Sequence, residues 1–133
     1  LHMKWILYSD GASRGNPGLS GAGAFLTSET GEEVELIQFL GVKTNNQAEY
    51  EALLLGLTDL VKRQATDVEI RADSELLIKQ LKGEYKVKHE NIIPLYKKAK
   101  ELISNFKTTR FTHVPREQNK IADRLSNEAI DLR

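Results

Sequence analysis

Four carboxylates are the residues of this 133-residue sequence whose positions best suit catalytic chemistry: Asp10, Glu49, Asp73 and Asp123. Asp10 and Asp73 each end an apolar, strand-like run, whereas Glu49 and Asp123 lie near the start of helical patterns. Carboxylates that converge repel one another and raise each other's pKa unless a cation lies among them. An all-oxygen set of this kind suits Mg²⁺ or Mn²⁺ better than zinc. Two such ions about 3.5–4 Å apart would hold a phosphodiester and activate water for in-line attack.

Each acid also has an ordinary structural interpretation. Asp10 can initiate a turn, Asp73 can be a helix N-cap, and Glu49 can close a capping box with Asn46. Asp123 can simply favour the start of a helix through the helix dipole. These interpretations explain the acids one at a time but not together. Strand ends and helix N-termini fall on the same edge of an α/β sheet, so we expect the four acids to converge there.

The periodicity of apolar residues predicts the elements that position these acids. Strands are expected at 4–10, 20–27, 32–40, 67–73 and 108–114, and helices at 47–64, 74–81, 91–106 and 119–132. The first three strands have short connections and form an antiparallel meander, while helices separate the later ones. This order predicts an α/β fold with a five-stranded mixed sheet and helices on both faces. The last helix should bury Ile121, Ala122, Leu125 and Ala129.

The amino-acid composition limits the functions that this protein can have. Nineteen basic and nineteen acidic residues cancel, so the net charge gives no attraction to nucleic acid. Lysines gather between Lys79 and Lys100, which is typical of a solvated helix face or of a phosphate-binding surface. The absence of cysteine excludes thiol catalysis and cysteine-bound zinc.

The domain organisation is simple. Residues 1–3 are interpreted as an expression remnant plus the natural start, and residues 4–133 as a single catalytic domain. The first apolar segment is too short for a signal sequence or a membrane span. We therefore expect a soluble, cytoplasmic protein that does not bind membranes.

Four segments in series carry a resemblance to a known family: SDGASRGNPG, TNNQAEYEAL, ADSELLIKQL and VPREQNKIADRLSNEA. With them the sequence resembles the type 1 ribonuclease H family over residues 3–132. The resemblance implies a ribonuclease H-like fold and endonucleolytic cleavage of the RNA strand of RNA–DNA hybrids, leaving 5′-phosphate and 3′-hydroxyl ends. It also implies Mg²⁺ as the cofactor, with Mn²⁺ as a substitute, and a monomer.

The resemblance also assigns roles to the four acids. Asp10 would bridge two ions, Glu49 and Asp73 would complete the leaving-group side, and Asp123 would hold the ion that activates water. The substrate contacts that it implies are Gly11, Ala12, Ser13, Asn16, Thr44, Asn45, Asn46 and Gln47. Small residues and amides suit close contact with a duplex and recognition of its 2′-hydroxyls. Thr44 resembles a residue that binds a phosphate of the DNA strand, and one of the two asparagines could instead cap a helix.

The sequence departs from many bacterial relatives, which carry a catalytic histidine on a flexible loop before the last aspartate. His113 precedes Asp123 by ten residues, but the alternating pattern of 108–114 places it in a strand, where a packed histidine is the commoner case. Arg116 lies in the following loop, and we predict that it takes the place of the histidine by holding a phosphate.

A basic, tryptophan-bearing protrusion found in many relatives is absent, because the segment 82–91 is short and the one tryptophan is Trp5. Lys82, Lys86 and Lys88 would form a reduced basic surface with salt-dependent binding. Some relatives that lack these features also cleave double-stranded RNA, which is therefore a second candidate substrate.

Two other functions compete with the hybrid nuclease. One is another ribonuclease H-like nuclease or integrase-type domain, which would have different spacing and usually lacks the TNNQAEY element. The other is a non-catalytic hybrid-binding module. A protein that only binds a polyanion gains nothing from an acidic cluster, so the acids argue against this second alternative.

Overall fold

The computed structural model describes residues 3–133, so the first two residues of the supposed expression remnant lie outside the described part. Five strands and four α-helices follow in the expected order. The strands are β1 (Lys4–Gly15), β2 (Gly18–Ser28), β3 (Glu33–Lys43), β4 (Asp67–Ala72) and β5 (Thr108–His113). The helices are α1 (Asn45–Lys62), α2 (Glu75–Leu81), α3 (Ile93–Ile103) and α4 (Lys120–Asp131), with a 3₁₀ turn η1 (Arg116–Gln118) before α4.

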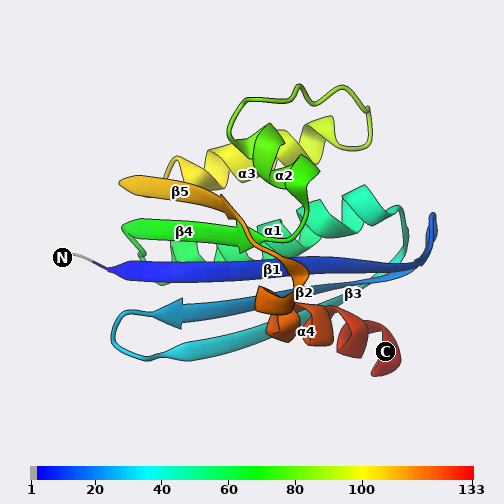
Figure 1. Cartoon of the computed structure of the whole chain (residues 1–133), viewed down its shortest axis with the longest axis horizontal. Helices are drawn as coiled ribbons and strands as arrows, with labels where there is room; N and C mark the ends of the chain where they lie inside the picture. Colours follow the sequence, from blue (N-terminus) through cyan, green and yellow to red (C-terminus); the bar gives the residue numbers. More distant parts are fainter. Residues whose placement is uncertain (1–2) are drawn as a thin grey trace.

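The sheet has the strand order β3-β2-β1-β4-β5, with β1 in the centre (Figure 1). Strand β1 runs antiparallel to β2, and β2 runs antiparallel to β3, which is the predicted meander. Strands β1, β4 and β5 are parallel to one another. The prediction of a five-stranded mixed sheet is therefore confirmed.

Strand β1 is longer than its sequence pattern indicates. We expected it to end at Asp10, where glycines and small polar residues are typical of a turn. The ladder with β2 instead continues through Asp10, opposite Gly23, as far as Gly15. Pairing with β4, in contrast, stops at Tyr8. Asp10 therefore lies inside β1, just beyond the last residue of β1 that pairs with β4.

Helix α1 covers one face of the sheet and forms the core with it. Leu7, Leu53 and Leu57 are fully buried between the two layers. Gly56 makes this approach possible, because a Cβ at that position would lie 2.4 Å from Leu7 Cδ1. Helix α3 packs against α1, which places α1 in the middle of the molecule (Figure 1).

Helix α4 covers the other face, over β1 and β2 (Figure 1). Its predicted buried residues Ala122, Leu125 and Ala129 are confirmed, together with Ser126 and Ile130. The prediction for Ile121 is wrong, since its side chain is 40% exposed. Positions 122, 125, 126, 129 and 130 form a stripe at helical spacing that faces the sheet, and position 121 lies outside it.

Glycines in β2 set how closely α4 approaches. A Cβ at Gly21 would lie 2.3 Å from the carbonyl oxygen of Ser126, and a Cβ at Gly23 would lie 2.5 Å from the amide nitrogen of the same residue. The middle of α4 therefore rests directly on the backbone of the strand. Within residues 3–133, no helix is long and apolar enough to cross a membrane.

Candidate active site

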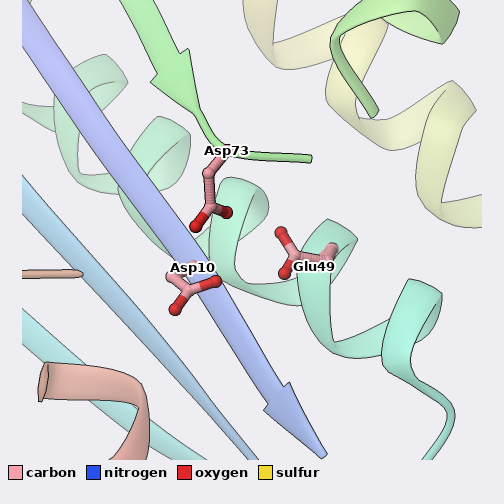
Figure 2. Close-up of side chains that lie close together, drawn as sticks. All are labelled: Asp10, Glu49 and Asp73. Carbon is pink, nitrogen blue, oxygen red and sulfur yellow. The ribbon is translucent and has the colours of Figure 1, made fainter. Parts of the chain in front are cut away.

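Three carboxylates meet beside the end of β4. Asp10 comes from β1, Glu49 from the first turns of α1, and Asp73 from the residue that follows β4, and their side chains point toward one another (Figure 2). One oxygen from each lies within 4.8 Å of the others. Asp123, in α4, lines the same cleft but stands outside this tight group. The structure thus brings together the four acids that the sequence indicated, three of them closely.

Two backbone groups that flank Asp10 have unusual hydrogen-bond partners. The Gly11 N–H donates to Oε1 of Glu49 at 3.3 Å, and the Ser9 carbonyl accepts from Nδ2 of Asn119 at 3.0 Å. Both groups lie beyond Tyr8, where pairing with β4 ends. Side chains from α1 and from the start of α4 therefore take the place of a neighbouring strand on either side of Asp10.

Gly11 is required by the packing of α1. A Cβ at this position would lie 2.2 Å from the carbonyl carbon of Ala48, deep inside van der Waals contact. Sequence reasoning attributed this glycine to a close approach of nucleic acid. The structure shows that the space beside its Cα is filled by α1, and a substrate contact at Gly11 stays a prediction.

Neighbouring residues cap the helices, so the acids do not. Thr44 is the N-cap of α1 and forms a capping box with Gln47, which overturns the alternative that Asn46 and Glu49 form one. Neither asparagine at the start of α1 is the cap. Ser74 caps α2, which overturns the alternative that Asp73 does so. Glu49 and Asp73 are therefore free for another role.

Burial perturbs the acid–base behaviour of the cluster. It raises the pKa of Asp10 to about 7, and the nearby charge of Asp73 adds to the effect. Burial and the charge of Asp10 raise the pKa of Glu49 well above its usual range. The pKa of Asp73 is also raised by burial, although the charge of Arg116 opposes this. The cluster therefore resists full ionisation when no cation is present.

The donor set fits a hard divalent cation. All of its atoms are carboxylate oxygens, which Mg²⁺ and Mn²⁺ prefer. Oε2 of Glu49 is buried and has no hydrogen-bond partner among the described residues. A buried polar atom of this kind is costly unless something binds it, and a cation beside Asp10 would do so.

Arg116 and His113 also line the cleft. Sequence reasoning treated His113 as a packed strand residue, but its side chain is exposed and lines the cleft. It can do so because β5 ends at this residue. Arg116 lies in η1 and is also exposed. Both stand near Asp73, where they partly oppose the rise in its pKa that burial causes.

The predicted substrate contacts divide into two groups. Ala12, Ser13, Asn45 and Asn46 line the cleft with Gly11. Thr44 and Gln47 hold the start of α1 through the capping box, and Asn16 Oδ1 accepts the N–H of Asn45 at 3.0 Å. The second group therefore positions Asn45 and Asn46 at the start of α1.

Sequence reasoning assigned no role in the cleft to Asn127 and left Arg14 open between a nucleic-acid contact and a solvent-facing side chain, and both residues line the cleft. Asn127 Nδ2 donates to the carbonyl of Asp123 at 3.0 Å and lies 3.5 Å from its Oδ1. Its position one helical turn after Asp123 was the available signal. Arg14 pairs with Asp131 at 2.7 Å, a contact across the fold that no local pattern indicates.

Comparison with known proteins identifies the family. The family model described as reverse transcriptase-like matches residues 8–129. The crystal structure of RNase H1 from the halophilic archaeon Halobacterium salinarum superimposes with a TM-score of 0.93 at 41% identity, covering 98% of this chain and 99% of that one. The chain belongs to the type 1 ribonuclease H family. The high TM-score shows that the fold described above is the ribonuclease H fold.

Other ribonucleases H support the assignment. The N-terminal RNase H domain of Rv2228c from Mycobacterium tuberculosis matches with a TM-score of 0.93 at 42% identity, covering 96% of this chain and 99% of that chain. The whole bifunctional protein Rv2228c is 44% identical over 131 residues, and the chain spans 36% of its length. LC11-RNase H1, solved in complex with an RNA/DNA hybrid, is 41% identical with a TM-score of 0.90, covering 96% of this chain and 97% of that one.

Proposed function

We propose that this ribonuclease H domain cleaves the RNA strand of RNA–DNA hybrids internally and leaves 5′-phosphate and 3′-hydroxyl ends. The observation that carries the proposal is the approach of Asp10, Glu49 and Asp73 oxygens to within 4.8 Å of one another in an open cleft. Its support from relatives is the solved complex of LC11-RNase H1 with an RNA/DNA hybrid.

Asp10, Glu49, Asp73 and Asp123 would hold two Mg²⁺ ions, with Mn²⁺ as a substitute. Bound there, the ions would supply an activated water and would stabilise charge on the attacking and departing oxygens. Asp10 interacts with Glu49, Asp73 and Asp123, which supports assigning it the contact with both ions. The distribution of the acids over β1, α1, α4 and the end of β4 fixes the set on rigid elements.

Other residues of the cleft would bind and orient the hybrid. Asn45 and Asn46 are exposed at the start of α1, where side-chain amides and backbone N–H groups favour contact with phosphate and sugar oxygens. We assign Gly11, Ala12, Ser13, Asn16, Thr44 and Gln47 to the same surface. Arg116 would hold a phosphate of the RNA strand near Asp73 without changing its own protonation.

The proposal also covers the oligomeric state, the location and a second substrate of the protein. A single chain supplies all four acids, which supports a monomer as the working unit. The cytoplasmic location stays a prediction. Because the basic protrusion is absent, double-stranded RNA is included as a second substrate to be tested.

One assay tests the proposed function. End-labelled RNA–DNA hybrid, double-stranded RNA and double-stranded DNA are incubated with the protein and Mg²⁺, Mn²⁺ or chelator, beside the Asp10→Asn variant. We expect internal cuts in the RNA strand of the hybrid only when metal and Asp10 are both present. Cuts that persist in chelator or in the variant would overturn the metal-dependent mechanism. Cleavage of double-stranded RNA would widen the substrate class.

A further inference from the structure

Asn119 connects two of the acids through its backbone and its side chain. It is only 1% exposed and lies immediately before α4. Its side-chain Nδ2 donates to the carbonyl of Ser9, the residue before Asp10, at 3.0 Å. Its backbone carbonyl accepts the N–H of Asp123 at 3.1 Å. One residue therefore joins the strand that carries Asp10 to the first turn of the helix that carries Asp123.

We propose that Asn119 is a positioning residue that sets the separation of Asp10 and Asp123 and thereby the strength of metal binding at the Asp123 side of the site. This inference rests on the proposed function. It assigns to Asn119 no contact with the ion or the substrate.

The need for such a residue follows from the sheet. Beyond Tyr8 the β4 side of β1 has no strand to pair with, so the Ser9 carbonyl would be a buried acceptor without a donor. Leaving a buried acceptor unsatisfied costs about 1–3 kcal/mol. Asn119 supplies the donor from the other segment that reaches this point, and the start of α4 is thereby fixed to β1.

The placement of Asp123 depends on this link more than the placement of the other acids does. Asp123 stands outside the group whose oxygens lie within 4.8 Å of one another. Gly21 and Gly23 let the sheet-facing side of α4, from Ala122 onward, rest on β2. Ser126 Oγ donates to the Asp123 carbonyl at 2.8 Å and makes a long, 3.5 Å contact with Oδ2 of Asp10. Asn119 supplies the shorter hydrogen bond between β1 and the start of α4, so it sets most directly where the first turn of α4 lies relative to Asp10.

A second buried side-chain amide, away from the cleft, provides a control that distinguishes a positioning role of Asn119 from a general contribution to stability. Gln80 is 8% exposed and accepts a 2.7 Å hydrogen bond from the hydroxyl of Tyr50, which joins α2 to α1 away from the cleft. Replacing either amide with leucine keeps most of the side-chain volume and removes one short, buried hydrogen bond, together with a long 3.5 Å bond from Nε2 of Gln80 to the Lys86 carbonyl in the control. Gln80→Leu is thus the matched control for Asn119→Leu.

The first test measures Mn²⁺ binding to the free protein by titration calorimetry, without nucleic acid. We expect about tenfold weaker binding in Asn119→Leu, which is the usual scale for residues that orient metal ligands. Gln80→Leu should bind Mn²⁺ as the parent does, although both variants lose stability. Equal Mn²⁺ affinity in Asn119→Leu and the parent, or an equal loss in both variants, would overturn the role of Asn119.

A double-mutant cycle with Asp123→Ala completes the test. If Asn119 acts through Asp123, the double variant binds Mn²⁺ no more weakly than Asp123→Ala alone. Losses that multiply would show that Asn119 acts elsewhere and would overturn the proposal. A parent protein in which Mn²⁺ binding is absent, or is unaffected by Asp10→Asn, would overturn the proposed function itself, so the two failures are distinguishable.

Discussion

The backbone N–H of Gly11 donates to Oε1 of Glu49 at 3.3 Å, so the residue after one acid of the cluster directly orients another. This contact exists because Gly11 lets α1 come against β1. A methyl group at Gly11 would lie 2.2 Å from the carbonyl carbon of Ala48. At Gly11, therefore, β1 with Asp10 and α1 with Glu49 come into direct contact.

Gly11→Ala should separate α1 from β1. We expect a loss of about 2–4 kcal/mol in unfolding free energy, which is typical of strong overpacking, together with weaker metal binding as Glu49 moves. Urea unfolding and Mn²⁺ titration measure the two effects. Gly31→Ala is the control, because a Cβ there meets nothing within 4 Å and only its φ of 91° adds strain. Comparable stability in the two variants would contradict the packing argument.

The metal-free protein should lose stability as the pH rises. The pKa of Asp10 is raised by burial from an ordinary value of 3.8 to about 7. A raised pKa means that the protonated form favours the folded state, so its contribution is complete below about pH 4 and is lost as the pH passes 7. In chelator, the unfolding free energy should fall by about 2–4 kcal/mol between these limits.

Asp10→Asn removes this pH dependence and should make the metal-free protein more stable than the parent at pH 8 while abolishing cleavage. At pH 4 the two proteins should differ little. Thermal melting in chelator across this range provides the measurement, and adding Mg²⁺ should restore the parent alone. A variant that melts below the parent at pH 8 would show that the carboxylate of Asp10 stabilises the fold.

Arg116→Ala should slow cleavage more than His113→Ala does. Both side chains line the cleft, and the charge of Arg116 influences Asp73 more strongly than that of His113. Loss of a phosphate-binding guanidinium should reduce turnover by about tenfold, a typical value for one charged hydrogen bond. Single-turnover cleavage of the hybrid measures both variants. The reverse order of the two rates would assign the assisting role to His113.

Hybrid binding should depend on salt through Lys82, Lys86 and Lys88, which are exposed around the turn after α2. Each lysine that contacts a phosphate adds about 0.9 to the slope of log affinity against log salt. Changing all three to glutamine should lower that slope by up to about 2.7, and Lys4→Gln should leave it unchanged. Binding measured at several salt concentrations in chelator provides the slopes. An unchanged slope in the triple variant would place the phosphate contacts elsewhere.

The sequence predicted the elements and the convergence of the acids because both depend on local patterns. Apolar periodicity located the helices, and the ends of strand-like runs located Asp10 and Asp73. The first strand was nevertheless expected to end at Asp10, since glycine and serine after it are typical of turns, whereas here they continue a ladder with the small residues of β2. The length of β1 is decided by its pairing with β2, which no local sequence pattern specifies.

Contacts between distant segments were not accessible from the sequence. Asn119 and Ser9 are 110 residues apart along the chain, and the Arg14 contact with Asp131 spans a similar distance. The capping residues were also misassigned, because Thr44 and Asn46 are both good N-caps and only the backbone geometry at Thr44 distinguishes them.

The helix caps and the acids of the cluster are different residues, and this has a practical consequence. Because Thr44 and Ser74 cap the helices, the neighbouring acids can be neutralised without unwinding α1 or α2. Asp73→Asn together with Asp10→Asn would leave the surface formed by Asn45 and Asn46 intact. The same scaffold would then serve as a reagent that captures RNA–DNA hybrids and leaves them uncut.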